Sequence, residues 1–151
     1  MGYYFSPSTR GFYHDDLHDS MPADVVAITA AEHDVMIHGQ SDQREIVPLP
    51  DGKPTLAKKP PHHHPDLFIW DGVAFALKDL EIAKAYTRDR LRVARAPLLA
   101  ALDLQVLRAW EQGKTPYDIV DVLAKKQQLR DITKLVDQAA SWEELAAITV
   151  E

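Results

Sequence analysis

Imidazole and carboxylate side chains gather in one short segment near the N-terminus. His14, Asp15, Asp16, His18 and Asp19 all lie in the run from 14 to 19. Such groups are common metal ligands, and a bound metal ion can activate water for hydrolysis. The same residue types are also ordinary in a solvated connection between strands, and no further ligands can be identified. We therefore favour the solvated connection and keep a small metal-dependent hydrolase as a remote alternative.

The remaining histidines form no metal-binding motif. His33 and His38 are five residues apart, which places them on different sides of a helix, and the HExxH pattern is absent. His62, His63 and His64 lie between prolines and are expected to form an exposed tract. The sequence predicts no metal site and no cofactor.

Gly113-Lys114-Thr115 has the residue order of the end of a phosphate-binding P-loop. That loop needs a glycine five residues before Gly113, where this chain has Arg108, and a preceding strand, where a helix is expected. The chain has no cysteine, and no serine lies in a G-x-S-x-G nucleophile motif. We therefore expect no catalytic residues and a function other than catalysis.

A basic line in the C-terminal half is a candidate partner surface. Arg88, Arg92 and Arg95 follow each other at i, i+4 and i+7 on an otherwise acidic chain. A solvated helix face and an acidic binding partner both explain this line, and both interpretations stay open. Asp103 interrupts an apolar run and is expected to be partly buried and paired with a cation such as Arg130. The residues predicted to bind a partner are Arg88, Arg92, Arg95, Asp103, Arg108, Trp110, Arg130 and Asp131.

Composition limits the class of protein. The chain has 151 residues, 46% of them hydrophobic, which suffices for a core in one or two small domains. Its formal net charge of −6 repels phosphates, so no nucleic-acid partner is expected. The N-terminus lacks the pattern of a signal peptide and no apolar run is long enough to cross a bilayer, so we expect no membrane insertion.

Short strands with turn signals dominate the N-terminal half. Strands are predicted at 3–5, 11–13 and 24–28, the first two joined by a loop at 6–10. The run from Thr29 to Glu32 has the form of a capping box, and the helix that it begins is expected to end with Gly39 at the C′ position.

Two further hairpins are predicted around Asp-Gly turns. One joins 45–49 to 54–57 across Asp51-Gly52, and the other joins 67–70 to 73–76 across Asp71-Gly72. Between them, residues 58–65 contain prolines and consecutive histidines but little that could enter a core, which is typical of a stiff linker.

Helical periodicity covers the rest of the chain. Pro97 is expected to kink the first long helix or to begin a new one, because it lacks an N–H donor. Gly113 should end the next helix, Thr115-Pro116 should begin a third, and the run from Ser141 to Glu144 should cap a last short one. The sequence thus predicts an α+β protein with a β-rich domain at 1–57 that contains one short helix, a Pro/His-rich linker at 58–65, and a hairpin plus helical domain at 66–151.

Several short motifs, in this order, are similar to those of the tail fibre assembly proteins of caudoviruses and of phage-tail-like bacteriocins. In the N-terminal half they are Tyr3-Tyr4-Phe5-Ser6, Gly11-Phe12-Tyr13, the run from Met21 to Thr29, Glu32-His33, Gly39-Gln40-Ser41, Ile46, Asp51-Gly52-Lys53-Pro54 and Pro60-Pro61. In the C-terminal half they are the runs 98–103, 107–109 with Gly113, and 126–133. The resemblance covers most of the chain.

The resemblance implies a chaperone that binds the distal part of a trimeric tail fibre and assists its folding, trimerisation and assembly. Such a protein would act in the cytoplasm of the bacterial host, and some relatives stay on the assembled particle. By analogy with the family, the helical half would contact the fibre, and self-association is a further expectation. The alternative is a permanent subunit at the fibre tip that contributes to host attachment by recognising surface glycan.

Overall fold

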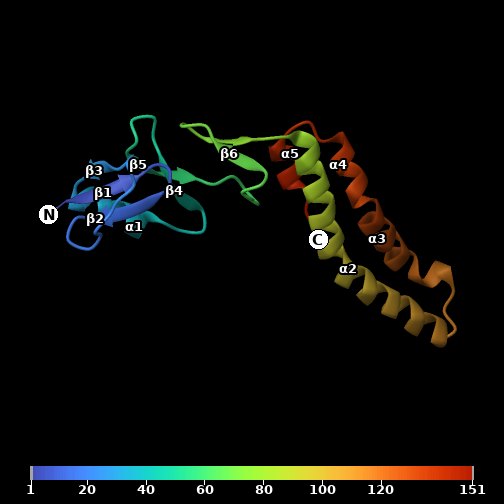
Figure 1. The fold of residues 1–151 in the computed structure, drawn as a ribbon. Coiled ribbons are helices and arrows are strands. Elements are labelled where there is room, and N and C mark those ends of the chain that lie inside the picture. Colours follow the sequence, from blue (N-terminus) through green and yellow to red (C-terminus); the bar gives the residue numbers. More distant parts are fainter. Residues whose placement is uncertain (1, 151) are drawn as a thin grey trace. The chain divides into compact units, whose positions relative to one another are not determined.

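The computed structural model describes residues 2–150, which form an α+β fold as predicted. The chain divides into two compact units, Met1–Lys78 and Asp79–Glu151. The first unit contains small antiparallel sheets and one helix, and the second is helical (Figure 1). Contacts therefore divide the chain after Lys78, whereas the domain boundary at 58–65 stays a prediction from sequence.

The first sheet has three strands in the order β2-β1-β3. Its strands are β1 (Tyr3–Ser6), β2 (Gly11–His14) and β3 (Val26–Ile28), and both pairings with β1 are antiparallel. The predicted hairpin is confirmed, while the third strand is shorter than expected. Phe5 and Ile28 extend from this sheet into a core that also contains Ile46, and aromatic side chains of the hairpin pack around it.

Helix α1 (Ala30–Gly39) begins at the predicted capping box. The Thr29 hydroxyl accepts a hydrogen bond from the backbone N–H of Glu32, and the Glu32 carboxylate accepts one from the Thr29 N–H. The Thr29 N–H and the Thr29 hydroxyl both donate to the Glu32 carboxylate, and these two bonds lower the pKa of that carboxyl. Gly39 is the last helical residue and not a left-handed C′ residue, so that expectation was wrong. An added Cβ would lie 2.2 Å from Cδ1 of Leu56, and a close approach to the next hairpin explains this glycine.

Strands β4 (Arg44–Pro48) and β5 (Pro54–Lys58) form the second predicted hairpin. Ile46 pairs with Leu56, and both pack into the core shared with β1 and α1. Gly52 has a φ of 84°, which explains a glycine in this turn. One face of the hairpin therefore closes the core of the first unit, and alternate residues face the other way.

Strands β6 (Phe68–Trp70) and β7 (Phe75–Leu77) form the third hairpin, whose turn is wider than predicted. Trp70 pairs with Phe75, so Val73 and Ala74 belong to a four-residue loop and not to a strand. The Asp71 carboxylate accepts the N–H groups of Val73 and Ala74 at 2.8 Å each. These bonds lower the pKa of the Asp71 carboxyl and hold the loop in its four-residue form.

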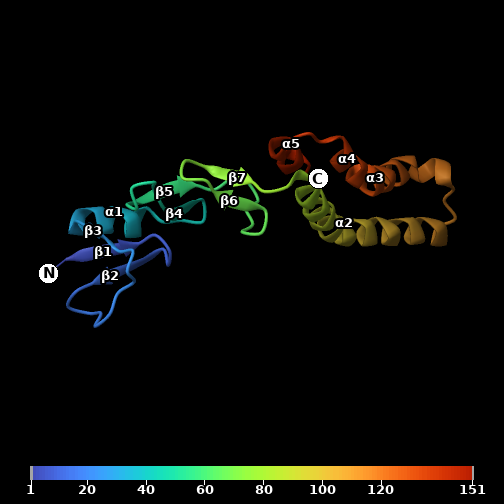
Figure 2. The same ribbon diagram turned by 45° about the horizontal axis from the view of Figure 1, so that its top comes forward.

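Helix α2 (Leu80–Glu111) runs through Pro97 without interruption, so no new helix begins there. The ribbon changes direction in the middle of α2 (Figures 1 and 2), which agrees with the predicted kink. Its C-terminus has the hydrogen bonds of a Schellman motif, from Gly113 N–H to Trp110 O and from Lys114 N–H to Ala109 O. Gly113 has a φ of 73°, so the predicted helix end is confirmed.

The chain then turns back along α2 (Figure 2). A 3₁₀ turn, η1 (Pro116–Ile119), begins at the predicted Thr115 cap and leads into α3 (Val120–Asp131), a second 3₁₀ turn, η2 (Ile132–Lys134), and α4 (Leu135–Gln138). Ser141 caps the last helix, α5 (Trp142–Ala147), as predicted. The buried residues described in this unit are Ala83, Thr87, Leu91, Leu102, Val106, Ala109, Ile119, Leu129, Val136, Ala139, Trp142 and Leu145. Among residues 2–150, no helix is both long and apolar enough to cross a membrane.

Candidate functional site

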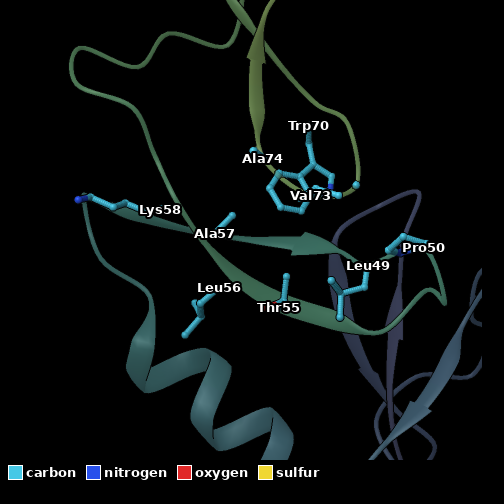
Figure 3. Close-up of a pocket in the computed structure, with 10 residues that line it drawn as sticks. Leu49, Pro50, Thr55, Leu56, Ala57, Lys58, Trp70, Val73 and Ala74 are labelled. Carbon is cyan, nitrogen blue, oxygen red and sulfur yellow. The ribbon is translucent and has the colours of Figure 1, made fainter. Parts of the chain in front are cut away.

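A groove of about 600 Å³ lies beside β5 in the first unit (Figure 3). We call it the Trp70 groove. It is lined by Leu49, Pro50, Thr55, Leu56, Ala57, Lys58, Trp70, Gly72, Val73 and Ala74. Thr55 and Ala57 point from β5 toward Trp70, and Leu56 points the other way, toward α1 (Figure 3). The groove floor is thus one face of the β4–β5 hairpin, and the turn of the β6–β7 hairpin forms its wall.

Trp70 fixes the wall of the groove to its floor. The indole Nε1 donates a hydrogen bond of 2.6 Å to the carbonyl oxygen of Pro48 in β4. On its own hairpin, Trp70 meets Phe75 edge to face, with ring centroids 5.4 Å apart. Gly72 has a φ of 101°, which allows the chain to turn directly after Trp70 and Asp71. The groove is therefore built by β4, β5 and the β6–β7 hairpin, which are joined by hydrogen bonds.

The Trp70 groove is apolar and remains open to solvent. Val73 is 83% exposed at its edge and Leu49 is 38% exposed at its end, so neither side chain is covered in the described chain. Lys58 supplies a cationic group, and Thr55 a hydroxyl. Within residues 2–150, β5 pairs only with β4, which leaves its other edge without a partner strand. This combination suits an extended apolar segment of another protein, which can add backbone hydrogen bonds at a strand edge.

The candidate cluster of metal ligands at 14–19, expected to be a solvated connection, is only partly assembled. Ligand atoms of His14, Asp15 and Asp16 lie within 4.8 Å of one another, but His18 and Asp19 are not part of this group. Both oxygens of Asp15 accept the backbone N–H of Gly2 at 2.9 Å, which lowers the pKa of that carboxyl.

Imidazole nitrogens of the same segment also bond to the backbone. His14 Nδ1 accepts the N–H of Asp16 at 3.2 Å, and His18 Nδ1 accepts the N–H of His14 at 3.1 Å. These bonds shape a solvated turn after β2 and engage the Nδ1 atoms of His14 and His18.

The histidine tract is less exposed than predicted. The ring of His63 stacks on Phe68 with centroids 5.5 Å apart and meets Phe75 at 4.8 Å. Burial among these rings lowers the pKa of His63. His63 therefore belongs to the packing of the β6–β7 hairpin, while His62 is exposed.

The three arginines of the basic line each have a partner within the helical unit. Arg88 forms an ion pair with Asp137, and Arg92 one with Asp89 at 2.8 Å. Nη1 of Arg95 donates to the carbonyl oxygens of Leu129 and Arg130, at 3.1 and 2.8 Å. Arg88 and Arg95 thus join α2 to the returning helices, and Arg92 is the exposed member of the line.

The other predicted partner-binding residues divide between internal contacts and the surface. Asp103 pairs with Lys126 and not with Arg130, and its side chain is 55% exposed, so its expected burial was wrong. Asp131 accepts hydrogen bonds from Lys134 and Gln127, which lower its pKa. Arg108 and Trp110 are exposed near the end of α2, and Arg130 is exposed on α3. The structure does not bring these residues together into one site.

Sequence reasoning missed two contributions. Trp70 was recognised only as part of a strand, because its contact with Pro48 joins positions 22 residues apart. Arg90 lies between helices and its Nη2 donates to the carbonyl oxygen of Ile148 at 3.0 Å, near the end of α5. The position of Trp70 next to the Asp71-Gly72 turn was a sequence signal for its role. No sequence signal pointed to the contact of Arg90.

No family model matches the chain, and no solved structure matches it. The chain is similar to the probable tail fiber assembly protein of Shigella phage SfV, with 29% identity over 131 residues. The aligned region covers 81% of this chain and 73% of the phage protein, so it includes residues of both compact units. This relative supports the resemblance to tail fibre assembly proteins drawn from the short motifs.

Proposed function

We propose that this protein is a tail fibre assembly factor that binds the fibre protein and assists its folding and trimerisation. The observation that carries the proposal is the similarity to the probable tail fiber assembly protein of phage SfV over most of both chains. It would act during particle assembly in the bacterial cytoplasm, on the distal part of the fibre. Retention on the finished particle is a further expectation of the same proposal.

The Trp70 groove is the surface that best suits this function. Intertwined fibre trimers depend on contacts between distant residues and between chains, so unpaired strands are exposed while the trimer forms. An apolar groove beside an open strand edge can hold such a strand by backbone hydrogen bonds and by alternate side chains. We therefore place the fibre contact at Val73 and Leu49, in addition to the exposed residues predicted in the helical half.

Co-expression with the tail fibre protein encoded beside this chain tests the proposal. We expect the fibre alone to be largely insoluble and the co-expressed fibre to form soluble, detergent-resistant trimers. Trimers that form equally well without this protein would contradict the assembly role.

A pair of matched variants then tests the groove. Val73→Asp introduces a charge at its edge, and Leu17→Asp introduces the same charge at a residue that is 79% exposed and outside the groove. Both substitutions should leave the fold intact, because both side chains are largely solvated. Only Val73→Asp should reduce fibre capture, by about tenfold or more. Equal capture by both variants would move the fibre contact to the helical unit and leave the assembly role standing.

A further inference from the structure

An exposed apolar seam runs along α2 on the side that faces away from the returning helices. Val93, Pro97, Ala100, Leu104 and Leu107 follow each other at steps of four, three, four and three residues. This is the spacing at which helices associate as coiled coils. We call these five residues the outer seam.

The outer seam lies opposite the packed face of α2. Leu102, Val106 and Ala109 are buried against the rest of the helical unit. Each residue advances about 100° around a helix, so Leu104 lies about 200° from Leu102. Figure 2 shows α3 along one side of the C-terminal half of α2 and no element of the helical unit on the other. Among the described residues 79–150, the outer seam therefore has no partner element.

Exposure agrees with this placement. Val93 is 76% exposed, Leu107 52% and Leu104 47%, and Pro97 and Ala100 are also exposed. Single exposed apolar residues need no explanation, but five at heptad spacing on one helix form a continuous stripe. The small Ala100 in its middle lets a second helix approach closely.

Two charged residues beside the outer seam indicate which partner binds it. Asp103 directly precedes Leu104, and Arg108 directly follows Leu107. In a parallel pair of identical helices, the residue at the first of these positions faces the residue five places further along the partner. Asp103 of each copy would then face Arg108 of the other, which gives two ion pairs of opposite charge.

An antiparallel pair lacks this complementarity. There Asp103 would face a residue at its own heptad position, which is Ala96, Asp103 or Trp110, and none of these is a cation. The ion pair of Asp103 with Lys126 does not prevent the new contact, because a carboxylate accepts hydrogen bonds on two oxygens.

We propose that a second copy of this chain binds the outer seam, so that two α2 helices pair in parallel with Asp103 opposite the partner's Arg108. The seam spans little more than two heptads, so the association is weak and depends on concentration. This inference does not depend on the fibre. Two copies joined at α2 would carry two Trp70 grooves.

The absence of native cysteine allows a direct test on the full chain. In a parallel pair, Ala100 lies next to the partner's Ala100, so Ala100→Cys should form a disulfide-linked dimer under mild oxidation. Ala124→Cys is the matched control, an exposed alanine on α3 and away from the seam. We expect rapid cross-linking for the first variant and little for the second.

Second-site changes separate the seam from chance contact. Adding Leu104→Glu and Leu107→Glu to Ala100→Cys should lower cross-linking about tenfold or more, with the helical circular dichroism retained. Arg108→Asp in the same background should also lower it, and adding Asp103→Arg should restore it. Sedimentation of the cysteine-free chain should show a monomer–dimer equilibrium that Leu104→Glu shifts to monomer.

Three outcomes would overturn the inference. Equal cross-linking at positions 100 and 124 would indicate random collision. A dimer that Leu104→Glu dissociates but Ala100→Cys does not link would indicate an antiparallel pair. A monomer at every concentration, whose fibre capture is lost with Leu104→Glu, would show that the fibre occupies the seam.

Discussion

His63 shows how a single side chain links packing to pH. Its ring lies against Phe68 and Phe75, and burial lowers its pKa below the ordinary value of 6.5. The unfolded chain therefore binds a proton on His63 at a higher pH than the folded chain does. Stability rises with pH wherever the unfolded state holds more protons, so this residue lowers the free energy of unfolding as the pH falls below about 6.5.

We predict that His63→Leu weakens the pH dependence of unfolding below about pH 6.5. Leucine keeps the apolar contacts with the aromatic rings and removes the titrating group. Urea midpoints at several pH values measure the effect, and His38→Leu, at an exposed position of α1, is the control. If His63→Leu leaves the slope of stability against pH unchanged, His63 is not held neutral by its neighbours.

At the scale of elements, the arginines of α2 have different roles despite their regular spacing. Arg95 donates to the last carbonyl groups of α3, where the helix dipole favours a cation. Arg92 pairs with Asp89 one turn earlier on its own helix, and such exposed pairs contribute little. Helical spacing alone does not separate these roles, because it contains no information on the neighbouring helix.

We predict that Arg95→Ala lowers the free energy of unfolding by about 1–2 kcal/mol, because it leaves two carbonyl groups without their donor. Arg92→Ala, the matched control on the same helix, should change it by less than about 0.5 kcal/mol. Thermal or urea unfolding followed by circular dichroism provides the comparison. Equal effects of the two substitutions would mean that the capping contact of Arg95 does not contribute to stability.

The contrast between local contacts and contacts with distant segments also explains which elements could be predicted from the sequence. Thr29, Gly113, Thr115 and Ser141 act within a few residues of themselves, so their capping roles follow from local patterns. The expectations for Gly39 and Asp103 were wrong because each depends on a distant neighbour. Gly39, at the end of α1, lies against Leu56 of the β4–β5 hairpin, and Asp103 pairs with Lys126 of α3. Contacts between distant segments depend on how the elements pack. The spacing of residues along one sequence does not show which segments will be neighbours.

The candidate site was harder to predict for the same reason. The Trp70 groove combines a turn of one hairpin with a strand of another, and none of its lining residues carries a catalytic or metal-binding signature. The resemblance to tail fibre assembly proteins indicated a binding function but favoured the helical half as its place. Exposed apolar groups identify a surface only when the fold shows which of them are neighbours.

At the scale of the whole chain, the question is which unit contains the β6–β7 hairpin. The domain boundary predicted at 58–65 would place this hairpin in the helical domain, whereas contacts assign it to the first unit. The hydrogen bond from Trp70 to Pro48 crosses that boundary. At the end of β5, the Lys59 N–H also donates to Gln43 O at 2.8 Å, which continues the ladder beyond Lys58.

We predict that the β6–β7 hairpin opens together with β4 and β5. Val47→Ala, at a fully buried position of β4, should cost about 1–3 kcal/mol and speed amide hydrogen exchange at Ile69 and Ala76 as well as in β5. Val136→Ala, equally buried in α4, should speed exchange in α2 and α3 and leave Ile69 and Ala76 unchanged. If the hairpin instead follows Val136→Ala, the boundary at 58–65 is correct, and the wall of the Trp70 groove can separate from its floor without unfolding either domain.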